Sequence, residues 1–327
     1  MSFFLRRAGQ TLFVLVGIIT LVFFILRLIP GDPVSVIAPS ASAEAKAQIR
    51  AQLGLDQSIW HQYALFWGQI AKGDFGQSYF FQGKAIDLVL AALPYTAALA
   101  GCALLIALAL AIPAGVLSAV NQDRLADRVV LGFCLVFQSA PNFWVALLLI
   151  SVIAIRLGFP TVAYVGPISL MLPSLALSIS LVAVLTQVVR NSLVGALHSD
   201  MATAMKARGL SLRRIIFVHS LRLSCVPLMT VIGVQLGYLL GGAVIIEYIF
   251  NYPGLGLLTL NAVLRRDYPL LQVIVLATAL IFLLINLAID MSYGLVDGRL
   301  SPGNSGSRRS GRALRAPRAI AGGGDVG

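Results

Sequence analysis

Six long apolar stretches constrain the fold of this chain more than any other feature. Each has about 18 residues or more, the length that an α-helix needs to cross roughly 30 Å of hydrocarbon at about 1.5 Å per residue. Lipid, or burial against other helices, is the environment that accepts such stretches. We therefore predict an all-α integral membrane protein with six transmembrane helices. The predicted spans lie near residues 9–29, 95–120, 129–155, 170–189, 227–249 and 270–295.

The composition agrees with a membrane chain. Hydrophobic residues make up 58% of the sequence and charged residues 11%, whereas about a quarter of a soluble domain is charged. This balance excludes a free cytosolic enzyme. Arg6 and Arg7 precede the first apolar run, as in a signal peptide, but the run from Thr11 to Ile29 is longer than the roughly 7–15 residues of a signal-peptide core. We interpret it as an uncleaved anchor.

The net charge of +11 is explained by topology and not by a nucleic-acid partner. Lys and Arg residues near helix ends are retained on the cytoplasmic side. If the N-terminus is cytoplasmic, sixteen of the 24 basic residues lie inside and eight outside. An even number of spans returns the C-terminus to the cytoplasm. We expect a multi-pass membrane protein with both termini cytoplasmic.

Three connections are informative because of their size. Residues 31–94 form an external segment in which 44–53 and 60–70 have helical apolar spacing. Residues 190–226 form a long cytoplasmic loop. The tail, 301–327, consists largely of Gly, Ser, Pro and Arg, a composition that cannot bury a core, so we expect it to be disordered and its Arg residues to be solvated or to contact anionic lipid. Residues 1–300 are the predicted transmembrane domain.

The cytoplasmic loop carries the clearest local signals. Asp200 can cap a helix that starts at Met201, and Gly209 stands where a left-handed residue ends that helix. Ser211 can cap a second helix that continues toward Pro227, where the fifth span is expected to begin. One interpretation is a solvated loop that follows the positive-inside rule. The other is a rigid docking element for a cytoplasmic partner.

No motif for catalysis or metal binding stands out. The three cysteines have no C-x-x-C pairing, and the three histidines are isolated, without an H-E-x-x-H arrangement. The chain also has neither a G-x-S-x-G elbow nor a G-x-x-x-x-G-K-[ST] phosphate loop. We therefore predict a chain that is not an enzyme and that binds no cofactor or metal. Its energy must come from a partner or from an ion gradient.

A gradient-driven carrier needs a titratable group deep in the bilayer. The acidic candidates are Glu247 and Asp290. Glu247 lies 20 residues after Pro227, or about 30 Å along a helix, which predicts a position at the outer surface. The same reasoning places Asp290 at the inner surface. A self-sufficient secondary transporter is therefore our alternative and not our first interpretation.

Four neutral polar residues fall deep in the predicted spans. Their simplest role is hydrogen bonding between helices. The alternative is that they line a path for a polar, hydrated substrate. Proline at 113 and at 141 should interrupt the backbone hydrogen bonds of the second and third spans and bend them. The neutral polar residues are Gln138, Asn142, Gln187 and Gln235.

The sequence resembles a known family in several places. Residues 200–211, Asp-Met-Ala-Thr-Ala-Met-Lys-Ala-Arg-Gly-Leu-Ser, are similar to the EAA loop of ABC importer permeases in the dipeptide, oligopeptide and nickel group. Further matches follow in the family's order, and the resemblance runs from the N-terminus to about Leu300. These matches are Leu-Arg-Leu-Ile-Pro-Gly-Asp-Pro at 26–33, Leu-Gly-Leu-Asp at 53–56, Gly-Asp-Phe-Gly-Gln-Ser-Tyr at 73–79, Glu-Tyr-Ile-Phe-Asn-Tyr-Pro-Gly-Leu-Gly at 247–256 and Arg-Asp-Tyr-Pro at 266–269.

This resemblance implies a type I ABC importer permease fold, a place in the inner membrane of a prokaryote, and a set of partners. The partners are a second homologous permease, two ATPases that carry ATP and Mg²⁺, and an extracytoplasmic substrate-binding protein. Peptides, glutathione and nickel complexes all remain open as cargo. Thr203 replaces the Glu of the general motif, and Met205 replaces its second Ala. The implied ATPase-docking helix comprises Asp200, Met201, Thr203, Ala204, Met205, Lys206, Ala207, Arg208, Gly209 and Leu210.

A Pro- and Gly-rich turn follows the fifth predicted span. We expect it either to be a plain helix-ending turn or to belong to an external gate or to the docking surface for the binding protein. The residues concerned are Glu247, Phe250, Pro253, Gly254 and Gly256.

Overall fold

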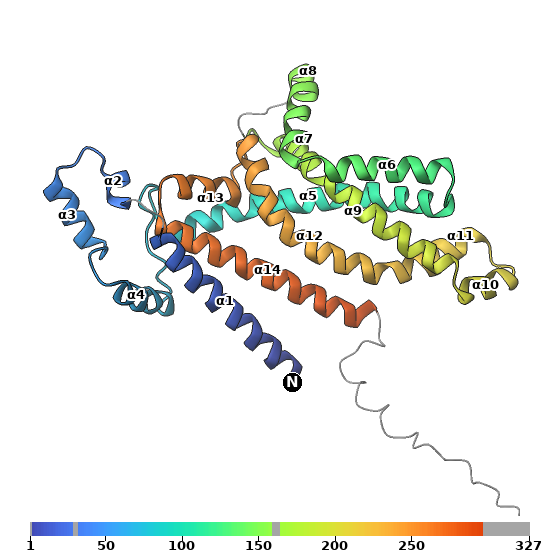
Figure 1. The fold of residues 1–327 in the computed structure, drawn as a ribbon, viewed down its shortest axis with the longest axis horizontal. Helices are drawn as coiled ribbons and strands as arrows, with labels where there is room; N and C mark the ends of the chain where they lie inside the picture. Colours follow the sequence, from blue (N-terminus) through green and yellow to red (C-terminus); the bar gives the residue numbers. More distant parts are fainter. Residues whose placement is uncertain (1, 29–31, 159–163, 297–327) are drawn as a thin grey trace, which may run out of the picture.

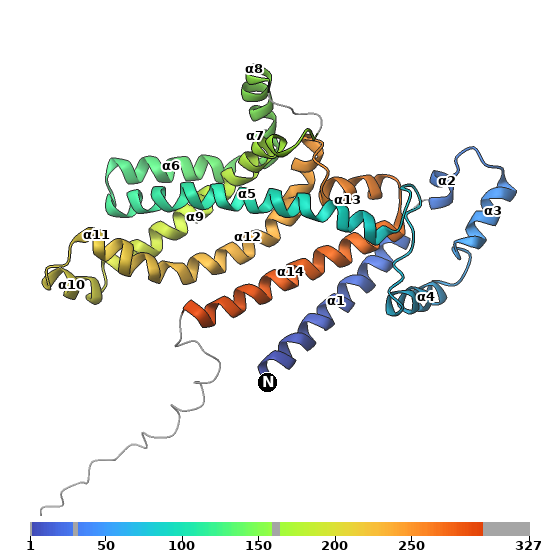
Figure 2. The ribbon, with the colours of Figure 1, turned by 180° about the vertical axis from the view of Figure 1, so that it is seen from behind.

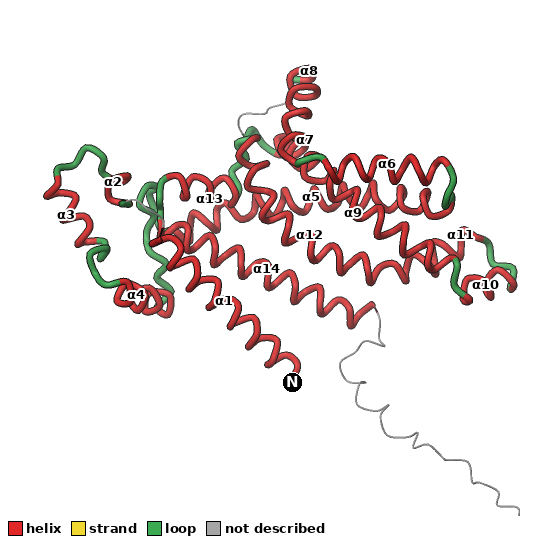
Figure 3. The backbone as a smooth tube through the Cα atoms, in the orientation of Figure 1, coloured by secondary structure: helices red, strands yellow, loops and turns green. Residues whose placement is uncertain are grey.

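The computed structural model describes residues 2–28, 32–158 and 164–296, and these residues are almost entirely helical (Figure 1). The predicted tail, 301–327, lies outside the described residues. Figure 3 shows helices joined by short loops, without a strand in the described part of the chain. The helices are α1 (Ser2–Leu28), α2 (Pro33–Ile37), α3 (Ala43–Gln52), α4 (Ile59–Ala71), α5 (Ala85–Val120), α6 (Leu125–Ser139), α7 (Asn142–Leu149), α8 (Ile155–Leu157), α9 (Met171–Leu197), α10 (Asp200–Ala207), α11 (Leu212–Arg214), α12 (Leu221–Ile249), α13 (Leu255–Leu264) and α14 (Tyr268–Val296).

Four helical segments of the described chain are long and apolar enough to cross a membrane, and a bent pair of helices provides a fifth candidate. Within α1, the stretch Phe13–Leu28 is apolar but shorter than the 18 residues required of a candidate span. The structure is therefore that of an all-helical membrane protein with four to five candidate spans. The four segments are Ala85–Val120, Pro167–Leu197, Leu212–Leu239 and Tyr268–Ile289.

The centre of the helical body is the contact between α5 and α9. Ala103, Ala107 and Ala111 recur every four residues along α5, and all three are fully buried. They form a face of small side chains. Between membrane helices the hydrophobic effect does not drive association, and small side chains let two helices approach closely enough for van der Waals packing. At Gly115 a Cβ atom would lie 2.7 Å from the side chain of Val189 on α9. Only glycine therefore fits at this position without displacing α9.

The predicted third span, 129–155, is not one straight helix. It consists of α6 and α7, which meet at an angle of 99°. Pro141 is the N-cap of α7, and its ring nitrogen has no hydrogen to donate to the end of α6. A π-helical segment, Ile150–Ala154, continues α7 into α8, which projects from the body (Figure 1). Pro113, by contrast, lies inside the continuous helix α5.

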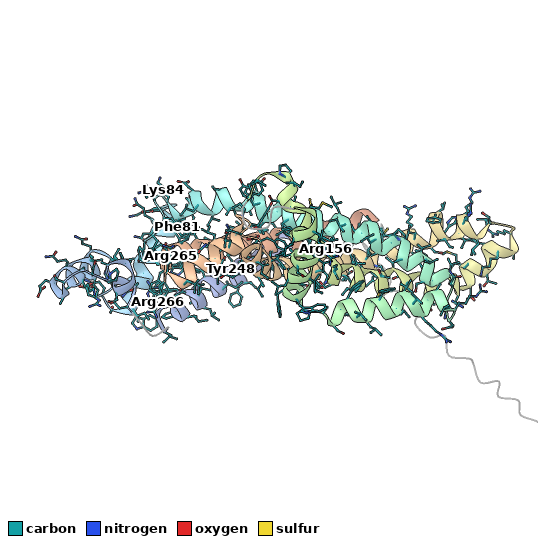
Figure 4. The ribbon with its side chains drawn as sticks, turned by 90° about the horizontal axis from the view of Figure 1, so that it is seen from above. Phe81, Lys84, Arg156, Tyr248, Arg265 and Arg266 are labelled. Carbon is teal, nitrogen blue, oxygen red and sulfur yellow. The ribbon has the colours of Figure 1, made fainter. Side chains whose placement is uncertain are left out.

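Helices α2–α4 and helices α10–α11 lie at opposite ends of the molecule (Figures 1 and 2). The two short helices expected between residues 31 and 94 are present as α3 and α4. Helix α4 lies against α1, where the Tyr63 and Thr20 hydroxyls are 2.8 Å apart and Arg27 Nε donates to Gln62 Oε1 at 2.8 Å. Helices α1 and α14 run side by side (Figure 2). Seen from above, Lys84, Arg265 and Arg266 lie toward the end that carries α2–α4 (Figure 4).

The α5–α9 contact makes a testable prediction about stability. Gly115→Leu should lower the free energy of unfolding by about 1–3 kcal/mol or more, because the new side chain must displace Val189. Thermal unfolding of the purified chain in mild detergent measures this. Gly101→Leu is the matched control, since Gly101 is on the same helix and a Cβ there meets nothing within 4 Å. Equal unfolding midpoints for the two variants would contradict the tight contact.

Candidate functional site

Helix α10, in the connection between α9 and α12, begins one residue earlier than the sequence suggested. The prediction that Asp200 is its N-cap was wrong, because Ser199 has the extended backbone of a cap and its hydroxyl accepts a hydrogen bond from the backbone N–H of Ala202 at 3.3 Å. Asp200 is instead the first residue of the helix. Its carboxylate there is favourable next to the positive end of the helix dipole.

The end of α10 is as predicted. Gly209 has a φ of +79°, in the left-handed region that glycine adopts without steric cost. Its N–H donates to the carbonyl of Lys206 at 2.9 Å, and the N–H of Leu210 donates to the carbonyl of Met205 at 3.2 Å. These two bonds form a Schellman motif, which stops the helix sharply. The chain therefore leaves α10 in a fixed direction.

Helix α10 offers nearly its whole surface to a partner. Ala202 is 1% exposed and faces α9, while Met205 and Leu210 are half-buried. Met201 leaves 43% of its surface free at the first turn. Thr203 stands where the general EAA motif has Glu. Its hydroxyl donates to the carbonyl of Ser199 at 3.3 Å, within the same helix, and it carries no negative charge. The remaining predicted docking residues are exposed, namely Asp200, Ala204, Lys206, Ala207, Arg208 and Gly209.

The loop is connected rigidly to two long helices. Helix α9 ends just before α10, and Ser211 caps the helical segment after it by accepting from the N–H of Arg214 at 3.4 Å. From Leu212 the helix continues through a π-helical segment, Ile215–Ser220, into α12. Ile215 and Ile216 anchor this segment because they are almost fully buried. A displacement of α10 must therefore move α9 and α12.

The half of the body nearer α10 contains a buried ion pair that sequence reasoning did not find. Asp127 on α6 is 2% exposed, and Arg190 on α9 donates to its two carboxylate oxygens at 2.7 and 2.6 Å. The Ser118 hydroxyl of α5 and the backbone N–H of Asp123 donate to the same carboxylate. This pair fixes α5, α6 and α9 to one another near the end of α9 that leads into α10. Its partners are 63 residues apart, so no local spacing indicates it.

Glu247 is enclosed by protein. Its side chain is 0% exposed. One carboxylate oxygen accepts from the Thr96 hydroxyl at 2.6 Å, and the other accepts from the backbone N–H groups of Gly256 at 2.7 Å and Leu257 at 3.0 Å. These N–H groups belong to the first turn of α13, which otherwise has no partners for them. The carboxylate therefore caps α13 from a different helix.

The depth of Glu247 in the membrane stays a prediction. The continuous helical run that holds Glu247 begins at Leu212, before the Pro227 from which its depth was counted. Helix α13 then continues for ten residues, about 15 Å, to Arg265. Figure 4 shows Tyr248 closer to the middle of the molecule than Arg265 and Arg266.

The glycines of the following turn make room for this capped helix. A Cβ at Gly254 would overlap the Glu247 carboxylate, and one at Gly256 would lie 2.5 Å from the Cα of Val244. Phe250 is 5% exposed and Pro253 is half-buried. Glu247, Phe250, Gly254 and Gly256 are therefore packed inside the chain.

Three tyrosines pack edge to face above the turn. Tyr252 lies 5.9 Å from Tyr95 and 5.7 Å from Tyr164, measured between ring centroids, and Tyr95 lies 5.2 Å from Tyr164. Burial raises the pKa of Tyr252 to about 12, so its phenol stays neutral at physiological pH. This cluster joins the first third of α5, which carries Tyr95, to the turn after α12, which carries Tyr252, and to the segment before α9, which carries Tyr164.

The structure brings together two of the four polar residues predicted in the spans. Gln187 on α9 donates to Gln138 on α6 at 3.2 Å, which is the interhelical hydrogen bond expected of such residues. Asn142 on α7 and Gln235 on α12 are half-buried. In the described part of the chain, no cluster of three His, Cys, Asp or Glu side chains has a metal-binding arrangement.

Asp267 is a third buried acid, and it joins two of the sequence motifs. It is 0% exposed and caps α14 by accepting from the N–H of Leu270 at 3.3 Å. Its carboxylate also accepts from the Ser78 hydroxyl and from the N–H of Tyr79 at 3.1 Å. An Asp two residues before a Pro at the start of an apolar run is a helix-start signal that could have indicated the cap.

Comparisons with known proteins agree with this architecture. Residues 111–302 match the family described as "Binding-protein-dependent transport system inner membrane component", and residues 1–100 match the N-terminal region of the same components. The chain is 33% identical over 335 residues to the dipeptide transport system permease protein DppB of Escherichia coli K12, covering 92% of this chain and 98% of that protein. It is 36% identical over 279 residues to the glutathione transport system permease protein GsiC of the same strain, covering 85% and 91%.

A solved structure supports the fold. A chain of the MetNI methionine ABC transporter, in inward-facing conformations, superposes with a TM-score of 0.57 over 65% of this chain and 97% of that chain, at 17% identity. The resemblance to ABC importer permeases is thus confirmed. The chain belongs to the family of binding-protein-dependent transport system inner-membrane components, the non-catalytic, multi-pass permease subunits of bacterial ABC importers, whose ATPase and binding-protein partners handle ATP and deliver the solute.

Proposed function

We propose that this permease imports peptides or a small peptide-like solute. The names of two similar proteins support this cargo, since one is a dipeptide permease and the other a glutathione permease. In this proposal the chain crosses the membrane six times, with α1 and the α6–α7 pair included, and has both termini in the cytoplasm. It pairs with a second homologous permease, two ATPases and an extracytoplasmic binding protein.

The observation that carries the coupling mechanism is the geometry of α10. It is a short, exposed helix with a capped start and a Schellman end, held between α9 and α12. We assign it as the coupling helix that sits on an ATPase. Closure of the ATPases then pushes α10, and the two long helices carry the displacement toward the outer half of the body. The docking surface consists of Asp200, Met201, Thr203, Ala204, Met205, Lys206, Ala207, Arg208, Gly209 and Leu210.

The outer gate in this proposal is the contact between α5, α12 and α13. Glu247 and Thr96 hold the first turn of α13, so separating these helices requires breaking hydrogen bonds to a carboxylate. Phe250, Pro253, Gly254 and Gly256 shape the turn that allows the contact. The binding protein docks elsewhere, on the external helices α2–α4. The solute path in this proposal is lined by the four neutral polar residues Gln138, Asn142, Gln187 and Gln235.

The coupling helix is tested by the composition of the purified complex. Gly209→Pro should abolish recovery of the ATPases, because proline fixes φ near −65° where Gly209 has +79°. Ala204→Glu should do the same by placing a charge on the docking surface. Affinity purification of the tagged chain from mild-detergent membranes, with mass spectrometry of its partners, measures this. Ala47→Glu, the same change on the exposed external helix α3, is the control and should retain the ATPases.

The second permease should be recovered with both loop variants, since α10 does not form the contact between the permeases. If instead the parent chain purifies alone and still moves a labelled dipeptide in liposomes without ATP, the coupling mechanism is wrong. A gradient-driven carrier would then take its place.

The gate is tested at Glu247. Glu247→Gln keeps the shape of the side chain but removes the negative charge at the start of α13, so it should destabilise the chain by about 1.5–3 kcal/mol and reduce ATP-dependent uptake of a labelled dipeptide in proteoliposomes of the complete complex. Both the thermal midpoint and the uptake rate are measured. Glu44→Gln on the external surface is the control. Parent-like values for both quantities would exclude a gating role for this carboxylate.

The orientation is tested by cysteine labelling in spheroplasts. Ser305→Cys should be protected from a membrane-impermeant maleimide because the C-terminus is proposed to be cytoplasmic. Ala47→Cys on α3 should be labelled under the same conditions, and both should react after permeabilisation. Labelling of residue 305 in intact spheroplasts would reverse the proposed topology.

A further inference from the structure

A cavity of about 490 Å³ lies between α1, α4, α14 and the loop that precedes α5. It is outside the coupling loop and outside the gate around Glu247. Its lining is polar at one end and apolar at the other. Arg27 and Tyr268 mark the polar end, at the external ends of α1 and α14, while Ile19 and Leu276 mark the apolar end.

The two ends of the cavity lie at different membrane depths. Ile19 precedes Arg27 by eight residues on α1, and Leu276 follows Tyr268 by eight residues on the neighbouring helix α14, which runs in the opposite direction. Eight residues of helix correspond to about 12 Å. The cavity therefore extends from the level of the outer membrane surface inward along two spans.

The polar end contains a cation without an anionic partner. The guanidinium of Arg27 donates to Gln62 Oε1 at 2.8 Å and to the carbonyl of Phe23 at 3.2 Å, and it lies 3.5 Å from the centroid of the Phe23 ring. All of these partners are neutral. The ion pairs in the described chain join other residues, and none includes Arg27. A half-buried positive charge of this kind is ordinarily paired.

A donor without a partner lines the same cavity. Gln272 Nε2 is buried and has no hydrogen-bond partner among the residues that the structure describes. It lies one helical turn inward from Tyr268, between the charged end and the apolar end. The one acidic side chain in the lining, Asp74, is exposed and accepts a hydrogen bond from the N–H of Gly76 at 3.0 Å. The enclosed part of the cavity thus offers donors to an anion.

The lining indicates an amphipathic ligand from the membrane. Away from Arg27, apolar side chains of three helices line the cavity, namely Ile19 of α1, Leu65 and Phe66 of α4, and Val273 and Leu276 of α14. In the proposed topology α1 and α14 cross the membrane, so this apolar part of the cavity lies at the level of the lipid chains.

We propose that this cavity binds a phospholipid with an anionic headgroup. The headgroup phosphate accepts hydrogen bonds from Arg27 and Gln272, and an acyl chain lies against Ile19 and Leu276. Basic pockets between membrane helices bind anionic headgroups by this chemistry. The bound lipid would fix the external helix α4 against α1 and α14. This site is separate from ATPase docking and from solute transport.

Native mass spectrometry of the complex in detergent tests the proposal. The probes are dioleoyl phosphatidylglycerol, dioleoyl phosphatidylcholine and inorganic phosphate. The parent should bind phosphatidylglycerol in preference to phosphatidylcholine, and Arg27→Gln should weaken that binding about tenfold, as expected when a charged hydrogen bond is lost. Arg265→Gln is the matched control, because Arg265 is also at the external end but lies near Phe80 and Phe81, outside the cavity. It should bind like the parent.

Two further variants keep the test valid if Arg27→Gln misfolds. Gln272→Glu retains the size of the side chain but adds a negative charge, so it should also lose phosphatidylglycerol. Leu276→Trp should fill the apolar end and exclude the acyl chain. Equal binding by the parent, Arg27→Gln and Gln272→Glu would overturn the proposal. Binding of inorganic phosphate without any lipid preference would also overturn it, because the anion would then come from solution. ATPase recovery should not change in any of these variants.

Discussion

The close approach of α5 and α9 is the constraint on which the rest of the body depends. Small side chains on α5 and the absence of a side chain at Gly115 let the two helices touch along much of their length. Helix α9 also packs against α6, α7 and α12 and leads into α10. Any movement of α10 must therefore also move α9, and the close contact with α5 fixes the position of α9.

Three buried acids add directional bonds to this steric core. Each is held by a hydroxyl from α5 or from just before it, since Ser78 binds Asp267, Thr96 binds Glu247 and Ser118 binds Asp127. The three pairs lie just before α5, in its first half and near its C-terminal end. Helix α5 and the segment before it thus have a polar anchor at three levels of the body, and each anchor connects them to a later part of the chain.

Features encoded by neighbouring residues could be predicted from the sequence, and features that depend on distant residues could not. Gly209 follows a short helical pattern and ends α10 as expected, because a left-handed residue is a local requirement. The pair formed by Asp127 and Arg190 has no local signature. The start of the fifth predicted span was placed at Pro227, but the helical run begins fifteen residues earlier, at Leu212, and passes through a π-helical segment. Proline inside this run does not end it, because the packing of the whole helix and not the local sequence decides where it stops.

The bend between α6 and α7 gives the chain a built-in optical reporter. The sequence contains three tryptophans. Trp60 and Trp67 are on α4, and Trp144 lies on α7 just after the bend, where half of its side chain is exposed. A chain with phenylalanine at the two α4 positions would have a single indole at this joint. Its emission would then follow the polarity around α7 directly, without a chemical label.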